Sequence, residues 1–332
     1  MEKIRYKEPD LARGMGIILV VLGHSIKQTQ VSAEWIKILT FLIYSFHMPL
    51  FFALSGFVAV KVLYMEDFKD RLNYIKDRAV RLLVPYAVVT LIYIPVKLKL
   101  SAYAVEPFTT RDLAGILIGD SPCVSMWFLY VLFVVSTICA LFVSMSNFRS
   151  ILYGSFALSA ALYWANLNIR TGKYLFFFLL GIWIRLKFED ARKEGIEDVL
   201  SGQSILAFFA VIIFVGLEVL LYRTTITGTM VGTSLLGIYL ALWSAGCLLR
   251  HYRQSPATKL LDFLGMHSME IYILHEPVMT VLKLVLWNKL GLNYILCSVL
   301  IFIGAIILSI AVSVLIVRRF GITRLLLLGE KT

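Results

Sequence analysis

Three histidines lie within long apolar stretches of the chain, where an ionisable side chain is costly and therefore suggests a function. His24 lies in RGMGIILVVLGHSI, His47 in SFHMPLFFALSGF and His275 in SMEIYILHEPVM. Each histidine alone is compatible with a packing role. Three of them on three different apolar stretches instead indicate a shared site, because neutral imidazole is suited to general acid–base or nucleophilic chemistry.

A proline follows two of these histidines at a spacing of two residues. Pro49 follows His47, and Pro277 follows His275. Proline removes a backbone donor and loosens the helix around it. We therefore expect each helix to be opened locally at the depth of its polar side chain, although a proline kink filled by a histidine gives the same pattern.

Two further polar side chains accompany His275. Tyr272 lies three residues before His275, on the same face of a helix, and Glu276 follows it directly. Trp127 begins another apolar stretch, SMWFLYVLF. Trp127 fits either an aromatic belt residue or a platform on which a sugar ring packs. Tyr272 and Trp127 are therefore candidates for contacts with a substrate.

Cationic residues lie at the ends of the apolar stretches that we expect to face the cytoplasm. Arg13 precedes His24 by eleven residues, which is about 16 Å along a helix. Arg78 and Arg81 are three residues apart and share a face, with Lys76 nearby. Guanidinium groups bind phosphate oxygens through paired hydrogen bonds. These cations are therefore candidates for binding a polyphosphate, although each also fits the ordinary excess of cytoplasmic charge.

The elements that must position these side chains are membrane-spanning helices. The chain has 332 residues, of which 59% are hydrophobic and only 16% are charged, as is typical of polytopic membrane proteins. The apolar stretches of this chain are continuous, and so do not fit the alternation of apolar and polar residues in the strands of a membrane β-barrel. We predict an all-α fold, a polytopic integral membrane helical bundle of about ten transmembrane helices. The expected spans are 11–26, 38–60, 82–97, 124–145, 150–168, 174–188, 203–222, 228–249, 263–287 and 293–317.

The distribution of charge predicts the orientation. Most of the 32 Lys and Arg residues lie in alternate loops, which, with an even number of spans, places both termini in the cytoplasm. The net charge of +11 is explained by this topology and by contact with anionic membrane lipids, so we expect no nucleic acid partner. The four cysteines are isolated, and we expect no metal site.

Taken together, these motifs resemble the membrane-bound acyltransferase-3 family, and the resemblance runs through the whole chain. The motifs that carry it, in chain order, are arginine, ten residues and histidine at Arg13 and His24; MPLFFxLSGF at 48–57; arginine-x-x-arginine at Arg78 and Arg81; Trp-Phe-Leu from Trp127; and S-x-x-x-Y-x-x-H-x-P at Ser268, Tyr272, His275 and Pro277.

The resemblance implies a single acyltransferase-3-like transmembrane domain over residues 1–332, in the bacterial cytoplasmic (inner) membrane. It implies an O-acetyltransferase that moves an acyl group, commonly acetyl, from cytoplasmic acetyl-CoA to a hydroxyl of an envelope or exported carbohydrate or a lipid-linked glycan. The arginines near the cytoplasmic face are then expected to bind the phosphates of acetyl-CoA. His24 is expected to act in the transfer.

A mechanism follows as a hypothesis. His24, which burial keeps neutral, is the general base for the acceptor hydroxyl. His47 or His275 orients His24, donates to the thioester oxygen or protonates the leaving thiolate, and Glu276 holds one of them in its tautomer. A covalent acyl-histidine intermediate is an alternative. The sequence does not choose among these roles.

The competing interpretation is a proton-coupled membrane transporter of a small polar solute. Broken helices with histidines and a carboxylate at the membrane midplane are also found in such transporters. Against it, no inverted repeat is visible, and a transporter has no evident use for Arg78 and Arg81. A third interpretation is a polymer exporter or a structural partner in an envelope-glycan complex.

Overall fold

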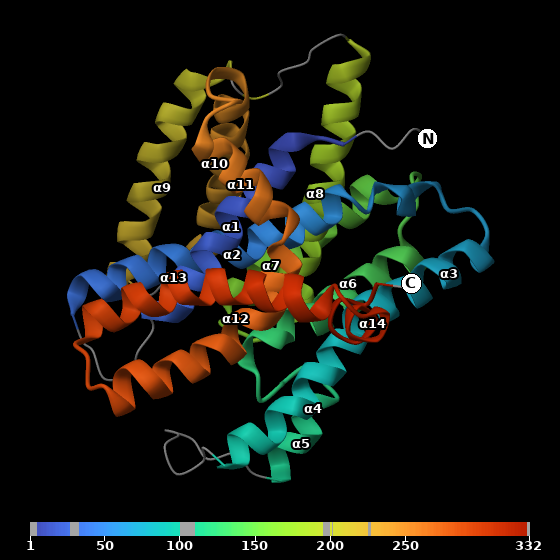
Figure 1. Ribbon diagram of the computed structural model, residues 1–332. Coiled ribbons are helices and arrows are strands. Elements are labelled where there is room, and N and C mark those ends of the chain that lie inside the picture. The colour runs from blue at the N-terminus through green and yellow to red at the C-terminus, as the bar shows by residue number, and fades with distance from the viewer. Residues whose placement is uncertain are drawn as a thin grey trace. The chain divides into compact units, whose positions relative to one another are not determined.

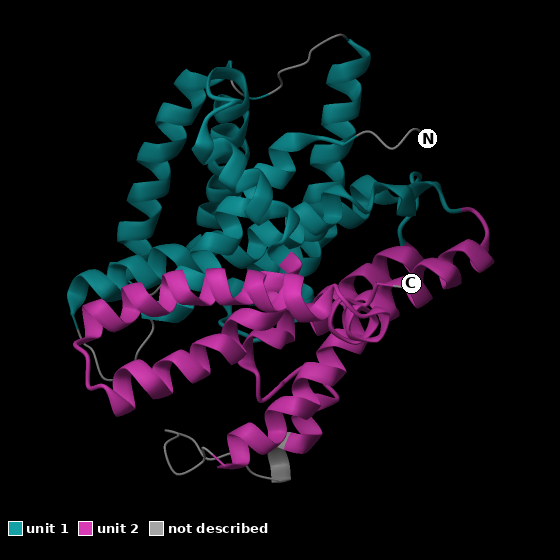
Figure 2. Cartoon of the chain, viewed as in Figure 1, with its two compact units in different colours: residues 1–65, 143–268 teal, residues 66–142, 269–332 magenta. Residues whose placement is uncertain are grey.

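The computed structural model describes residues 5–26, 33–99, 110–194, 200, 202–224 and 227–330 (Figure 1). Regular structure in these residues is helical throughout. Contacts divide the chain into two compact units: unit 1 comprises residues 1–65 and 143–268, and unit 2 comprises residues 66–142 and 269–332 (Figure 2). Each unit therefore combines an N-terminal part of the chain with a part from much later in the sequence.

Unit 1 is built around α2, which packs against α1, α8 and α10. In addition, α1 packs against α11, α7 against α8, and α9 against α10, which lies beside it in Figure 1. The helices of unit 1 are α1 (Lys7–Ile26), α2 (Glu34–Phe57), α7 (Phe148–Trp164), α8 (Arg170–Lys193), α9 (Ser204–Thr224), α10 (Met230–His251) and α11 (Pro256–Met266).

Glycines bring the main chains of unit 1 into contact. A Cβ at Gly14 of α1 would meet the carbonyl of Leu261 on α11, and a Cβ at Gly181 of α8 would meet the carbonyl of Ala53 on α2. Small residues allow such close approach between helices in membrane proteins. These contacts fix the two helices that carry His24 and His47.

Unit 2 contains shorter helices joined by wide π-helical turns. In this unit α3 packs against α6, and α4 packs against α14. One π-helical turn, Ala79–Leu83, links α3 to α4. The helices are α3 (Phe68–Arg78), α4 (Val84–Lys99), α5 (Thr110–Ile116), α6 (Trp127–Phe142), α12 (Ser268–Lys283), of which Ser268 belongs to unit 1, α13 (Tyr294–Val312) and α14 (Gly321–Leu328).

The prediction of an all-α fold is confirmed for the described residues. Among the described residues, seven helical segments are long and apolar enough to cross a membrane. They are Lys7–Ile26, Glu34–Phe57, Phe68–Lys99, Val124–Phe142, Ser204–Thr224, Thr227–His251 and Tyr294–Val317. The chain is thus an integral membrane protein with several spans, and the full number of ten stays a prediction.

The three other expected spans also lie on helices, but these helices are not among the seven that are long and apolar enough to cross a membrane. The helix at 150–168 is α7, which has only 17 residues, and the helix at 174–188 is α8, which is charged towards both ends. The expectation of one continuous helix over 263–287 is wrong. The helix is interrupted at His267, between α11 and α12. Gly265 and Ser268, on either side of this break, have lower helix propensity than alanine or leucine.

Candidate active site

Two of the three predicted histidines lie on either side of one tyrosine in unit 1. The ring of His24 on α1 lies 6.2 Å from the ring of Tyr44 on α2, and the ring of Tyr44 lies 4.9 Å from that of His47. Tyr44 and His47 share a face of α2 because they are three residues apart. The structure therefore brings His24 and His47 into one row, and sequence reasoning missed the tyrosine between them.

A backbone carbonyl holds the buried ring of His47. Its Nδ1 lies 2.7 Å from the carbonyl oxygen of Ile43, one turn earlier on α2. A carbonyl only accepts hydrogen bonds, so Nδ1 carries the proton of the neutral ring and the basic lone pair is on Nε2. His47 is thus arranged as a neutral imidazole in a defined tautomer.

Pro49 opens the backbone of α2 without ending the helix. Proline at this position cannot donate to the carbonyl of Ser45. The hydroxyl of Ser234 on α10 donates to that carbonyl instead, at 2.8 Å, and Ser234 is fully buried. The α-helix is continuous past Pro49, and a side chain from a neighbouring helix satisfies the carbonyl that the proline leaves without a donor.

Arg13 is paired with a carboxylate on its own helix. Its Nη1 lies 3.1 Å from Oδ1 of Asp10, and Arg5 binds the other oxygen of Asp10 at 2.7 Å. From the sequence, Arg13 is a candidate for binding the phosphate of a ligand, and so for pairing with an anion. The structure supplies that anion as Asp10, in the first turn of α1.

The third histidine lies in unit 2 and shows the same backbone arrangement. Nδ1 of His275 on α12 lies 2.7 Å from the carbonyl of Tyr272 and 3.1 Å from that of Ile271. The basic lone pair of its neutral ring is therefore on Nε2. The tautomers of His47 and His275 are held by backbone carbonyls of their own helices, the role that had been expected of Glu276.

Glu276 holds the chain that leads into α6. Its carboxylate accepts from the backbone N–H groups of Val124 at 3.0 Å and Ser125 at 2.7 Å. The hydroxyl of Tyr272 donates to the carbonyl of Ser125. Two neighbouring turns of α12 thus fix the short 3₁₀ turn Val124–Met126, directly before Trp127. Charge-assisted bonds of this kind are strong, so the start of α6 is well defined.

Trp127 and Tyr272 belong to one aromatic row. The Trp127 ring lies 6.4 Å from that of Phe128, which lies 5.3 Å from the ring of Tyr272. The Tyr272 ring in turn lies 5.8 Å from that of His275. Unit 2 therefore brings together Trp127, Tyr272, His275 and Glu276, as one expects of a shared site.

Cys123 lies beside this group, and its side chain is completely buried. Burial, with a smaller contribution from the charge of Glu276, raises the pKa of the thiol. Because the thiolate is the reactive form, this cysteine fits the packing role expected of an isolated cysteine.

The arginines of the predicted phosphate site are engaged within unit 2. Nε of Arg78 donates to the hydroxyl of Tyr74 at 3.0 Å. Nη1 of Arg81 donates to the carbonyl of Leu328 at 2.7 Å and to Glu330 at 2.9 Å. Lys76 is exposed on α3. Arg81 therefore already binds a carboxylate in the segment that follows α14.

A carboxylate in α9 was missed by the sequence interpretation. Glu218 lies within the expected span 203–222, is 7% exposed, and belongs to a helix that packs against α10 and α2. The rule that ionisable residues within spans indicate function identifies Glu218 as readily as the histidines. The signal was thus present in the sequence.

The predicted residues form two groups that belong to different units (Figure 2). His24, His47 and Arg13 lie in unit 1. The group in unit 2 comprises Lys76, Arg78, Arg81, Trp127, Tyr272, His275 and Glu276. Unit 1 holds two imidazoles suited to proton transfer, and unit 2 holds cations, an aromatic row and the third imidazole.

Comparison with known proteins supports this chemistry. Residues 6–318 match the family model described as an acyltransferase domain. The nodulation protein NolL of Sinorhizobium fredii (strain NBRC 101917 / NGR234) is 39% identical over 79 residues, which cover 23% of this chain and 21% of that protein. NolL of Mesorhizobium japonicum (strain LMG 29417 / CECT 9101 / MAFF 303099) is 34% identical over 79 residues, or 23% and 20% of the two chains.

The matched stretch thus covers about a fifth of the length of these curated relatives. No solved structure matches the chain. The family match, in contrast, extends over nearly the whole sequence. The chain belongs to the acyltransferase-3 family of acyl-transferring enzymes.

Proposed function

We propose that this protein is an O-acetyltransferase of the bacterial cytoplasmic membrane, with ten spans and both termini in the cytoplasm. It transfers acetyl from cytoplasmic acetyl-CoA to a hydroxyl of an envelope or exported carbohydrate or of a lipid-linked glycan. The observation that carries the proposal is the row of His24, Tyr44 and His47 inside an acyltransferase-family chain. Imidazoles within membrane helices suit proton transfer during esterification.

In the reaction, the acceptor hydroxyl oxygen attacks the thioester carbonyl carbon of acetyl-CoA. His24 takes the hydroxyl proton, the new C–O bond forms, and the C–S bond breaks. The thiolate of CoA leaves and takes up the proton that His24 removed, which returns His24 to its neutral form. His47 supports His24 across the ring of Tyr44, with its own tautomer held by the carbonyl of Ile43.

The residues of unit 2 take the substrate-binding roles. Arg78, Arg81 and Lys76 bind the phosphates of acetyl-CoA. Trp127 and Tyr272 contact the acceptor, because an aromatic face suits the apolar face of a sugar ring. His275 is the imidazole of this group, and Glu276 positions the start of α6.

The test of this function is calorimetric binding of acetyl-CoA to the purified chain in nanodiscs, followed by transfer of labelled acetyl to a carbohydrate acceptor. We expect Arg78→Ala/Arg81→Ala to weaken binding about tenfold or more. The control Arg192→Ala/Lys193→Ala, which removes two exposed cations at the end of α8, should bind as the native chain does. A folded native chain that does not bind acetyl-CoA contradicts the proposal and favours the transporter.

The contact between Arg81 and Glu330 yields a separate prediction. The Glu330 carboxylate occupies the guanidinium that is expected to bind phosphate. Both side chains are about one-third exposed, so the pair contributes no more than about 1 kcal/mol. We expect Glu330→Gln to tighten acetyl-CoA binding by up to about fivefold.

The matched control for this prediction is Glu66→Gln, which removes an exposed acid of the same unit. Calorimetry should show tighter acetyl-CoA binding in Glu330→Gln but not in Glu66→Gln. The gain in affinity should be smaller at high salt than at low salt. Unchanged or weaker binding in Glu330→Gln would show that Arg81 holds the segment after α14 and does not bind the donor.

A further inference from the structure

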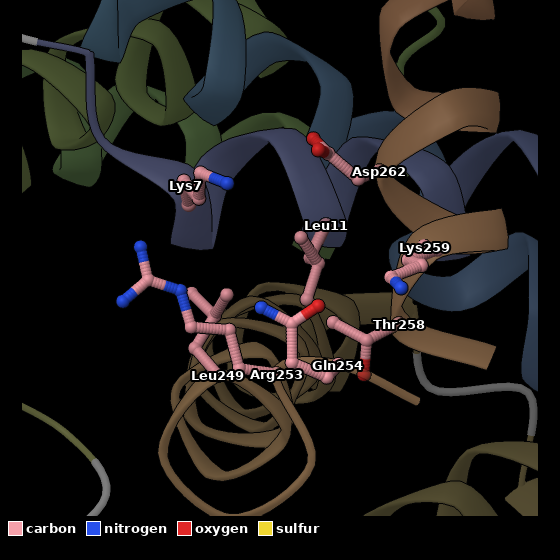
Figure 3. Close-up of a pocket in the computed structure, with 8 residues that line it drawn as sticks. All are labelled: Lys7, Leu11, Leu249, Arg253, Gln254, Thr258, Lys259 and Asp262. Carbon is pink, nitrogen blue, oxygen red and sulfur yellow. The ribbon is translucent and has the colours of Figure 1, made fainter. Parts of the chain in front are cut away.

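A pocket in unit 1 lies apart from the histidine row and is lined by three cations. Lys7 comes from the first turn of α1, Arg253 from the turn after α10, and Lys259 from α11 (Figure 3). The cavity volume is about 270 Å³. Figure 3 shows α1 on one side of the opening and the segment joining α10 to α11 on the other. Three elements therefore converge on one basic cavity.

The framework of the pocket is fixed by local structure. Ser255 caps the N-terminus of α11, accepting from the backbone N–H of Thr258 at 3.2 Å. The hydroxyl of Thr258 donates to the carbonyl of Tyr252 at 2.8 Å, which closes the turn after α10. The glycine contact between α1 and α11 brings the main chains of these helices together, since a Cβ at Gly265 would meet the carbonyl of Asp10. The cations are thus carried by a framework that has little freedom to move.

The charge of the pocket is not balanced. Asp262 is the one carboxylate among its lining residues, and Oδ1 of Asp262 lies 3.8 Å from Nη2 of Arg5, a fourth cation. Within the part of the chain that the structure describes, no ion pair involves Lys7, Arg253 or Lys259. Like charges that line one cavity favour a bound anion that neutralises them.

The size and walls of the pocket restrict the anion. Its volume lies just below the range of about 300–1,000 Å³ that is typical of pockets for drug-sized ligands. Leu11 and Leu249 supply apolar wall, and the Gln254 amide supplies a further donor. One or two phosphate groups fit such a space with their charges towards the cations.

We propose that this pocket is a binding site for a phosphate-bearing anion, a phosphomonoester or diphosphate. The phosphate comes either from the headgroup of an anionic phospholipid or from the nucleotide part of the acyl-CoA donor, and the second source rests on the function proposed above. Helix α1 links the pocket to the chemistry, since His24 lies about 25 Å further along it than Lys7.

The test uses the full chain in phosphatidylcholine nanodiscs and three probes: inorganic pyrophosphate, coenzyme A and phosphatidylglycerol. The pocket variant is Lys7→Gln/Arg253→Gln/Lys259→Gln. The control is Lys187→Gln/Arg192→Gln/Lys193→Gln, which removes the same charge from α8 in the same unit. Circular dichroism and thermal unfolding establish that both variants are folded.

We expect the native chain to bind pyrophosphate and the pocket variant to bind it at least about tenfold more weakly, with the control unchanged. The loss should shrink at high salt. Alongside the loss for pyrophosphate, a loss for coenzyme A identifies the donor as the source, and a loss for phosphatidylglycerol without one for coenzyme A identifies the lipid. Equal pyrophosphate binding by the native chain and the pocket variant overturns the proposal, as does a folded native chain that binds none.

Acetyl transfer measured on the same samples separates this proposal from the proposed function. If the native chain transfers acetyl and the pocket variant binds every probe normally, the pocket proposal fails and the function stands. If the native chain transfers no acetyl but the pocket variant loses pyrophosphate binding, the function fails and the pocket stands.

Discussion

Replacing His24 by alanine is expected to lower the rate of acetyl transfer by about 10²- to 10⁴-fold, with little change in the affinity for acetyl-CoA. The reason is the position of His24 near the far end of α1. It contacts the ring of Tyr44, and it lies about 16 Å along the helix from Arg13. A general base at this position affects the proton of the acceptor and not the phosphates of the donor.

Initial rates in proteoliposomes and calorimetry of acetyl-CoA measure the two effects on the same preparation. The control is His251→Ala, at an exposed histidine that ends α10. The assignment is contradicted if His24→Ala keeps a rate within about tenfold of the native rate. A larger loss in His47→Ala than in His24→Ala would transfer the role of base to His47, whose basic nitrogen is Nε2.

Hydropathy predicted the apolar parts of the helices but not where the helices begin. The span expected at 11–26 is the apolar part of α1, which begins at Lys7. Glu8 and Asp10 in its first turn suit the positive end of a helix but are invisible to a search for apolar runs. Such a search therefore finds the part of each helix that lies in lipid and misses the part that extends into the interface.

The consequences of a proline could be predicted only in part. Pro49 correctly indicated a freed carbonyl near His47, because this follows from the covalent structure of proline. The partner of that carbonyl is Ser234, which lies 189 residues further along the chain. Similarly, Glu276 binds the backbone of Ser125, and Arg81 binds Glu330. Such pairs depend on how the helices pack, which local patterns do not encode.

The close packing of α2 against α8 gives the second prediction with a large effect, that Gly181→Ala destabilises the protein. A methyl group at Gly181 would overlap the carbonyl of Ala53 and the backbone nitrogen of Phe57. Because the obstacle is main chain, the helices must separate, which costs about 1–3 kcal/mol or more. We expect a lower thermal unfolding temperature, and lower transfer activity because α2 carries His47.

The matched control is Gly216→Ala on α9, where an added Cβ has no neighbour within 4 Å. Helix propensity alone favours alanine over glycine by up to about 1 kcal/mol, so this variant should be as stable as the native chain or more stable. If the same substitution lowers the unfolding temperature at Gly181 but not at Gly216, the loss at Gly181 is due to packing and not to helix propensity. If Gly181→Ala unfolds at the native temperature, the main chains of α2 and α8 are not in the close contact from which this prediction is argued.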